Sequence, residues 1–312
     1  MKSKITIMLI STALIAGSCK ESSEGKDGTP IAKSTITVTD GKFTPEVMQN
    51  LGRLSDPQVS PDGTKILYGV SYTSIEQNKS NRELFVMNID GSDNKQITST
   101  VKSENNARWI NGGKQIAYLY GGQLYVMESD GSSAKKISDV ERGISEFSFS
   151  PKGDKILYIS TVKSIEKPAD KYPDLDKATG RIIKDLMYRH WDTFVEEIPH
   201  PFVADFNGKE LTNITDVLDG EPYECPTLPL SGIEQLSWSP DGENIIYACR
   251  KVVGVEYAFS TNTDIYLYNL ASKKAQNLTE GMMGYDTDPL YSPDGKSIAW
   301  ISMERNGYEA DK

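Results

Sequence analysis

A four-residue turn that recurs along the chain limits its fold more than any other feature. Ser-Pro-Asp-Gly occurs three times, a fourth copy has Lys in place of Asp, and a fifth is worn to Ile-Asn-Gly-Gly. In chain order the copies occupy residues 60–63, 110–113, 150–153, 239–242 and 292–295. Proline sets φ near −65° and glycine adopts a positive φ without steric cost, so each copy is expected to join two antiparallel strands.

The spacing of the copies predicts the architecture. Each copy is followed within a few residues by an apolar run such as Ile66-Leu67-Tyr68, and successive copies start 50, 40, 89 and 53 residues apart. Forty to fifty residues is the length of one four-stranded propeller blade. We therefore predict an all-β chain: a β-propeller of four-stranded antiparallel blades over 55–312, incomplete with about five blades present. The spacing of 89 predicts an insertion in the third blade, at about 163–199.

Individual strands can be placed from the repeat. Residues 83–92 match 123–132 position by position, and 264–270 repeats the pattern. For the first two blades the expected strands are 55–60, 65–72, 83–89, 95–98, 107–110, 115–120, 123–128 and 135–138. A lead-in over 34–54 is expected to hold a strand at 34–39 and a short helix, with Thr44 as its N-cap and Pro45 at its first position.

The N-terminus has the composition of an export signal. Lys2 and Lys4 precede an apolar run too short to span a bilayer, and small residues lead to Cys19. We expect a signal peptide over 1–18, lipidation of Cys19, as in a bacterial lipobox, and a polar tether over 19–33. Cleavage after an Ala-x-Ser site without lipidation is the alternative. The expected location is the periplasm or outer membrane of a Gram-negative bacterium, with membrane contact only through the lipid.

Charge and cysteine content exclude several classes of function. The chain carries 34 Lys and Arg against 44 Asp and Glu, for a net charge of −10, which argues against nucleic acid as a partner. No metal or cofactor is expected, because there is no CxxC motif and the two histidines, His190 and His200, lack the spacing of a zinc site. Cys225 and Cys249 remain as a possible disulfide in an oxidising compartment.

These repeats resemble two groups of propellers: TolB-like periplasmic proteins and the N-terminal domain of the prolyl oligopeptidase family of serine peptidases. Residues 43–63 resemble the opening of the exported dipeptidyl-peptidase and acylaminoacyl-peptidase branch of that family. The insertion segment Met-Tyr-Arg-His-Trp-Asp at 187–192 also resembles bacterial members of the branch. The resemblance covers 43–312.

The chain departs from that family in one respect. Family peptidases carry an α/β-hydrolase domain with a Gly-x-Ser-x-Gly elbow, and this pentapeptide does not occur here, so no catalytic triad can be assembled from these residues. We expect the propeller portion of an exported serine peptidase that releases dipeptides or acylated residues from peptide N-termini. It would filter access and bind the peptide substrate, while the hydrolase domain lies outside this chain. A TolB-like protein-binding module is the alternative.

The insertion is where such a propeller would acquire specificity. Ile183, Met187, Trp191 and Val195 recur every fourth residue, which predicts a helix over 181–197, after a polar loop over 168–179. The resemblance implies that Asp192, Glu196 and Glu197 hold the protonated amine of the substrate. The alternative is a helix on the propeller rim whose acidic side chains are only solvated.

Overall fold

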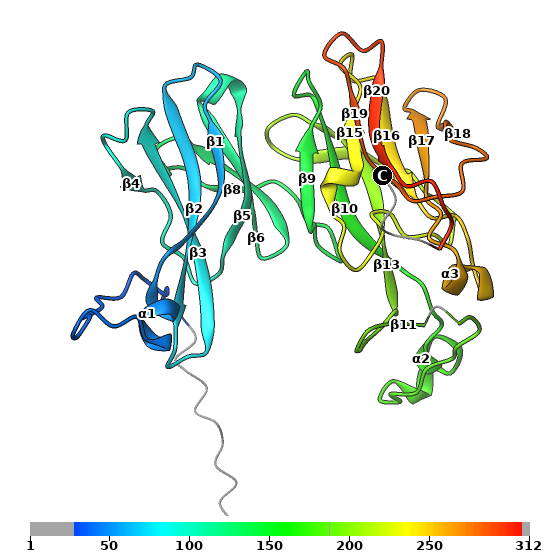
Figure 1. Cartoon of the computed structure of the whole chain (residues 1–312), viewed down its shortest axis with the longest axis horizontal. Coiled ribbons are helices and arrows are strands. Elements are labelled where there is room, and N and C mark those ends of the chain that lie inside the picture. Colours follow the sequence, from blue (N-terminus) through cyan, green and yellow to red (C-terminus); the bar gives the residue numbers. More distant parts are fainter. Residues whose placement is uncertain (1–27, 187, 308–312) are drawn as a thin grey trace, which may run out of the picture.

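The computed structural model describes residues 28–186 and 188–307, and in them the strands form consecutive antiparallel sheets that follow the chain (Figure 1). Four sheets of four strands are followed by a two-stranded sheet, and in each the strands are hydrogen-bonded in sequence order. The all-β propeller fold with four-stranded blades is therefore confirmed. The proposed signal peptide and Cys19 lie outside the described residues.

The first two sheets contain all the strands expected from the repeat, with ends that differ by at most four residues and most at the earlier starts of β3 and β5. Their strands are β1 (Arg53–Val59), β2 (Lys65–Ser74), β3 (Lys79–Asn88), β4 (Lys95–Gln96), β5 (Glu104–Ile110), β6 (Gln115–Tyr120), β7 (Gln123–Glu128) and β8 (Lys135–Lys136). The lead-in contains helix α1 (Pro45–Asn50), where Thr44 accepts the Val47 N–H at 3.4 Å and Pro45 takes the first position. The strand expected at 34–39 is absent.

The remaining sheets continue the same pattern. Their strands are β9 (Glu146–Phe149), β10 (Lys155–Lys163), β13 (Glu197–Phe206), β14 (Leu211–Asp216), β15 (Leu236–Trp238), β16 (Asn244–Cys249), β17 (Asp264–Asn269), β18 (Lys274–Asn277), β19 (Asp286–Tyr291) and β20 (Ile298–Ser302). Among the described helices, none is long and apolar enough to cross a membrane.

The Ser-Pro-Asp-Gly turns lie between the first and second strands of their sheets, as predicted. At the first copy the Ser60 hydroxyl donates to Asp62 Oδ1 at 2.6 Å and accepts the Lys65 N–H at 2.9 Å, and Gly63 has a φ of 72°. In the copy with Lys, Ser150 donates instead to Asp154 Oδ1 at 2.9 Å, so an aspartate four residues after the serine replaces the missing one.

The core lies between the sheets rather than inside any one of them. Adjacent residues of one strand pack on opposite neighbours: Ile116 packs against the first sheet and Ala117 against the third. Ile245 and Ile246 divide in the same way between the third and fifth sheets. Because side chains alternate across a strand, a sheet buried on both faces needs a continuous apolar run, and this explains the runs that follow the turns.

A repeated hydroxyl contact ties the fourth strand to the third. In three sheets a Thr or Ser accepts a backbone N–H of the third strand: Leu84 to Thr98 at 2.8 Å, Leu124 to Ser138 at 2.8 Å and Ile265 to Thr279 at 3.0 Å. The same hydroxyls donate to the preceding side chain, which is Glu83, Gln123 or Asp264. The third sheet departs from this pattern, since its buried His200 pairs through Nδ1 with Asp216 at 2.9 Å.

The insertion between β10 and β13 differs from the expected form. A helix over 181–197 is wrong: Arg189–His190 (β11) and Thr193–Phe194 (β12) pair as a hairpin instead. The helical turns α2 (Pro168–Lys171) and Pro173–Leu175 lie in the half expected to be a loop. A four-residue spacing of apolar side chains does not establish a helix where a Thr-Phe-Val run favours extended backbone.

Candidate functional site

The two ends of the sheets carry very different loops. At one end the strands are joined by tight turns, including the Ser-Pro-Asp-Gly copies. At the other end lie the long segments: α1, the insertion 164–196, the connection 217–235 and the segment 250–263 with helix α3 (Val255–Phe259). Figure 1 shows α1, α2, β11 and α3 together at the lower end. Because functional residues gather on long loops positioned by a rigid scaffold, this end is the candidate for the functional site.

A two-residue hairpin places the insertion's aromatic residue at the surface. His190 pairs with Thr193 across the hairpin, so Trp191 and Asp192 form its turn. Trp191 has a φ of 48° and its side chain is 76% exposed. A positive φ is rare for a bulky residue, but the common two-residue hairpin turns require it at their first turn position.

The three acidic residues expected to bind an amine do not form one cluster, because each has its own partners. Glu196 bonds to Lys167 Nζ at 2.8 Å and Arg181 Nε at 2.7 Å, and the contact with Lys167 is the main reason that its pKa is lowered. Glu197 pairs with Arg142 and accepts the Thr161 hydroxyl at 2.6 Å. Asp192 accepts the hydroxyl of the adjacent Thr193 at 3.3 Å. The carboxylates of Glu196 and Glu197 are thus already neutralised by cations of the chain itself.

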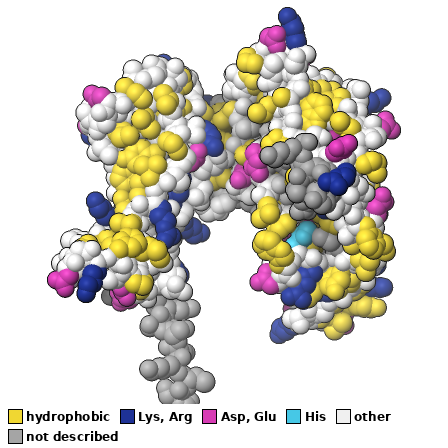
Figure 2. Space-filling view, viewed as in Figure 1, with side chains coloured by type: hydrophobic (Ala, Val, Ile, Leu, Met, Phe, Trp, Pro, Cys, Tyr) yellow, Lys and Arg dark blue, Asp and Glu magenta, His cyan; other side chains and the backbone are white. Residues whose placement is uncertain are grey.

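A different carboxylate occupies a buried position at this end. Glu224 is 4% exposed, and its carboxylate contacts His190 Nε2 at 3.2 Å and the hydroxyl of Tyr257. Burial, with Glu224 adding to it, raises the pKa of Tyr257. These groups line a cavity of about 230 Å³ together with Asp185, which we call the Glu224 cavity. Figure 2 shows a histidine among hydrophobic side chains in this lower part of the molecule.

A second cavity, also of about 230 Å³, adjoins the first. Apolar groups dominate its wall: Trp191, Phe194, Val195, Leu228 and Pro229. His190 and Val195 belong to both walls, so the two spaces are neighbours at the hairpin. We call this second space the Trp191 cavity. Asp192 and Glu197 lie at its wall, whereas Glu196 lines neither cavity.

Sequence reasoning missed Glu224. It lies in the connection between the third and fourth sheets, 34 residues after His190 of the hairpin that it contacts, and only the fold brings the two segments together. The available signal was local: an acid between Tyr223 and Cys225, in a segment where apolar neighbours indicate burial. A buried carboxylate is costly unless hydrogen-bonded, which makes it a candidate for a functional role.

Cys225 and Cys249, which the sequence left as a possible disulfide, are buried free thiols in the structure. They lie against each other's backbone: Cys225 Sγ donates to the Ala248 carbonyl at 3.3 Å, and Cys249 Sγ donates to the Glu224 carbonyl at 3.4 Å. Burial raises the pKa of both thiols. Their observed role is to pack the segment that carries Glu224 against the end of β16.

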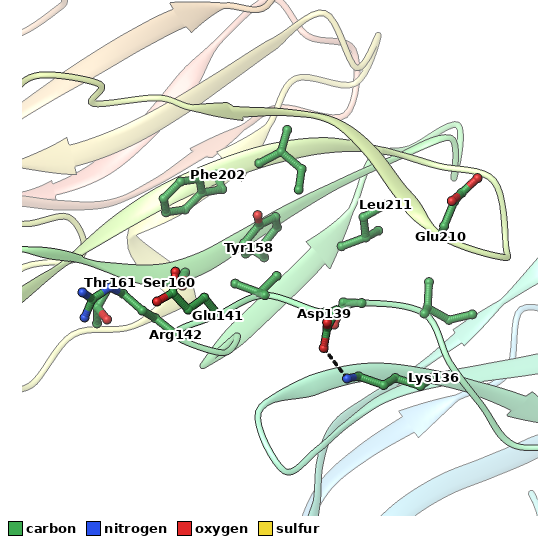
Figure 3. A pocket seen from close by; sticks show the side chains of 14 residues that line it. Lys136, Asp139, Glu141, Arg142, Tyr158, Ser160, Thr161, Phe202, Glu210 and Leu211 are labelled. Carbon is green, nitrogen blue, oxygen red and sulfur yellow. Dashed lines mark hydrogen bonds and ion pairs between the residues drawn. The ribbon is translucent and has the colours of Figure 1, made fainter.

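A larger cavity than these two, about 800 Å³, lies elsewhere (Figure 3). It opens between the outer strands of the second and third sheets, where Tyr158, Phe202 and Leu211 face the short strand β8. Sheets that radiate from one axis diverge toward their fourth strands, so a wedge between them follows from the fold. Lys136 pairs with Asp139 at its edge, at 2.5 Å.

Comparison with known proteins identifies the relatives of this chain. No family model matches it. Dipeptidyl-peptidase 5 of Porphyromonas gingivalis is 53% identical over 282 residues, a match that covers 89% of this chain and 41% of that protein. The protein of the same name from Porphyromonas endodontalis is 42% identical over 289 residues, with 91% of this chain and 41% of that protein covered. The chain thus spans about two fifths of the length of these relatives.

Among solved structures, an acylaminoacyl peptidase of Pyrococcus horikoshii has a TM-score of 0.58 at 18% identity, with 84% of this chain and 37% of that chain covered. At that identity the likeness shows the fold alone. Together with the sequence matches it confirms the resemblance to the dipeptidyl-peptidase and acylaminoacyl-peptidase branch of the prolyl oligopeptidase family. The chain is therefore a β-propeller homologous to about two fifths of the dipeptidyl-peptidase 5 proteins.

Proposed function

We propose that the chain is the propeller portion of a serine peptidase that releases dipeptides or acylated residues from peptide N-termini. The observation that carries the proposal is the 53% identity to a dipeptidyl-peptidase 5 over 89% of the chain. The propeller would limit access to the active site and bind the end of the peptide. The serine nucleophile, its histidine base and the oxyanion hole would come from a hydrolase domain of the longer protein.

Exposed apolar side chains support a longer protein. Leu54 and Val59 of β1 are 62% and 58% exposed, and Leu290 and Ile301 of the β19–β20 sheet are 60% and 58% exposed. Figure 2 shows hydrophobic side chains gathered over the first sheet. In the other sheets the corresponding faces are covered by a neighbouring sheet, so we propose that further blades or another domain cover these two.

Export and lipidation are also part of the proposal. The charged start, the short apolar run and the small residues before Cys19 support a lipoprotein signal. The mature protein would stand in the periplasm or at the outer membrane of a Gram-negative bacterium, held by lipid on Cys19 and a polar tether.

We place the binding site for the substrate's amine at the end of the propeller that carries the long loops. Asp192, Glu196 and Glu197 are the candidates from sequence. The cationic partners of Glu196 and Glu197 weigh against those two, because a substrate ammonium would have to displace a Lys or Arg side chain from each.

The proposed function is tested on the native protein. An antibody raised against this chain should detect in cell extracts a protein far longer than 312 residues, and a fluorophosphonate probe should label that protein, because the probe reacts with activated serines. The 312-residue chain purified alone should show neither labelling nor dipeptide release. Detection of only an unlabelled protein of 312 residues or fewer would contradict the proposal.

A further inference from the structure

We propose that the Glu224 cavity and the Trp191 cavity form one subsite for the first residue of a peptide. The Glu224 cavity would take the protonated α-amine, and the Trp191 cavity would take an apolar side chain on the same residue. This inference rests on the proposed function and names its substrate class: peptides with a free amino terminus and an apolar first residue.

The charge of the Glu224 cavity selects a cation. Its wall holds the carboxyl groups of Glu224 and Asp185 together with His190 and Tyr257, and no described Lys or Arg contributes to it. Among the described residues, no Lys or Arg lies within ion-pair distance of Glu224, whose partners are His190 and Tyr257. Arg250 stacks on the Tyr257 ring at 4.9 Å but is not part of the wall. A buried carboxylate that has no Lys or Arg partner gains most from a ligand that supplies a permanent cation.

Glu224 has no Lys or Arg partner in the described part of the chain, unlike the sequence-based candidates Glu196 and Glu197. Glu196 is held by Lys167 and Arg181, so binding an ammonium there would exchange one cation for another with little gain. At Glu224 the ligand's N–H groups would add to contacts with the neutral Tyr257 hydroxyl and with His190. Because the carboxylate is buried, a charge-assisted hydrogen bond to it is stronger than one at the surface.

The adjoining apolar cavity decides which ammonium compounds fit. A free amine and a side chain leave the same Cα of a peptide's first residue, so their subsites must be neighbours, and the shared wall of His190 and Val195 meets this condition. Together the two cavities fall in the range of roughly 300–1,000 Å³ that is common for small-molecule sites. Aromatic and aliphatic walls at Trp191, Phe194 and Leu228 favour an apolar side chain over a glycine or a charged residue.

The first test needs no variant. The 312-residue chain is titrated by calorimetry with Leu-Ala-amide, N-acetyl-Leu-Ala-amide and Gly-Ala-amide. We expect Leu-Ala-amide to bind at least about tenfold more tightly than the acetylated compound, because acetylation removes the charge that Glu224 recognises. It should also bind more tightly than Gly-Ala-amide. Equal affinity for the free and acetylated compounds, or no binding of any of them, would overturn the subsite.

Two substitutions then test separately whether the Glu224 cavity binds the amine and the Trp191 cavity binds the side chain. Glu224→Gln keeps the shape of the side chain and should abolish the preference for the free amine. Trp191→Ala should weaken binding of Leu-Ala-amide and leave Gly-Ala-amide unchanged. Glu196→Gln tests the rival carboxylate and should change neither affinity by more than about twofold, and Glu280→Gln, on an exposed side chain, is the matched control. A loss of preference with Glu196→Gln but not with Glu224→Gln would move the amine site to Glu196.

These outcomes are separable from failure of the proposed function, because the titrations measure binding by this chain alone. Binding that ignores acetylation, alongside fluorophosphonate labelling of the longer native protein, would reject the subsite and leave the peptidase proposal intact. Selective binding of the free amine by a native protein without serine reactivity would keep the subsite as that of a binding module.

Discussion

The serine and aspartate side chains stabilise the Ser-Pro-Asp-Gly turn. At the copy starting at Ser239, the serine hydroxyl donates to Asp241 Oδ1 at 2.5 Å and accepts the Asn244 N–H at 2.9 Å. This contact is the main reason that the pKa of Asp241 is lowered, and the equivalent contact at Ser60 lowers the pKa of Asp62 to about 2. The serine, which is 3% exposed at position 239, therefore links the two sides of the turn from a buried position.

Replacing Ser239 by Ala should destabilise the chain by about 1–3 kcal/mol, because the partly buried Asn244 N–H loses its side-chain acceptor. Urea unfolding monitored by circular dichroism measures the change. Ser272→Ala, at an exposed position between β17 and β18, is the matched control and should lie within about 0.5 kcal/mol of the parent chain. Equal unfolding midpoints for the two variants would show that the hydroxyl is dispensable.

Between the first two sheets, the Thr98 hydroxyl contacts a second glutamate, Glu104, in addition to Glu83. The Thr98 hydroxyl lies 2.9 Å from both Glu83 Oε2 and Glu104 Oε2, and both glutamates are at most 1% exposed. Burial raises the pKa of Glu104 to about 7 and also raises that of Glu83. One hydroxyl hydrogen cannot serve two carboxylates at once, so we expect a proton bound by the pair to stabilise the contact between these sheets.

The stability of the chain should therefore fall as pH rises. An unfolded Glu104 has its ordinary pKa near 4.5, so between that value and about 7 the folded chain binds a proton that the unfolded chain has released. The stabilisation is complete below the ordinary value and is lost as pH passes about 7. Thermal unfolding at pH values from about 5 to about 8 should show a falling midpoint for the parent chain and a smaller fall for Glu104→Gln.

The exposed Glu280→Gln variant provides the reference, and its midpoints should follow those of the parent chain across the same range. The prediction fails if Glu104→Gln keeps the full pH dependence. Gln123 occupies the place of Glu83 in the second sheet, where it accepts the Ser138 hydroxyl at 2.7 Å, so an uncharged side chain is compatible with the fold at this kind of position.

Sequence patterns predicted the repeated elements well because the same local sequence features recur in each blade. A turn, an apolar run and a Thr or Ser closing the fourth strand are local features, and β6 and β7 coincide with the strands expected. The insertion lacked such repetition. Its backbone is set by contacts distant in sequence, such as Arg181 stacked on the Phe194 ring at 4.0 Å, so side-chain spacing alone gave the wrong helix. Glu224 was missed for the same reason, since its partners come from two other segments.

Across the whole molecule, the propeller has tight turns at one end and long segments at the other, and we propose that the second end is the one that binds the peptide. The insertion, the segment with Glu224 and helix α3 all lie at the second end, where an added domain could meet the bound peptide. A tether at the N-terminus would hold this assembly near a membrane without restricting it.

Lipidation of Cys19 should fix the expressed protein to membranes. We expect the parent chain to sediment with the membrane fraction and to incorporate labelled palmitate, and Cys19→Ala to do neither, because the anchor depends on that thiol. Cys249→Ala, which removes a buried thiol instead, should leave the membrane association unchanged. Equal membrane association of the parent chain and Cys19→Ala would show that lipid on Cys19 is not the anchor.

Exchange of the propeller measures most directly whether this chain can serve a peptidase. In a chimera, it replaces the homologous two fifths of the Porphyromonas gingivalis dipeptidyl-peptidase 5, and kcat/KM is measured for dipeptidyl coumarylamides with a free amine. Labelling by a fluorophosphonate confirms that the hydrolase site of the chimera is intact. We predict kcat/KM within about tenfold of the unexchanged enzyme, a difference of about 1.4 kcal/mol in transition-state stabilisation. A labelled chimera that releases no dipeptide would contradict the assignment of this propeller to a dipeptidyl peptidase.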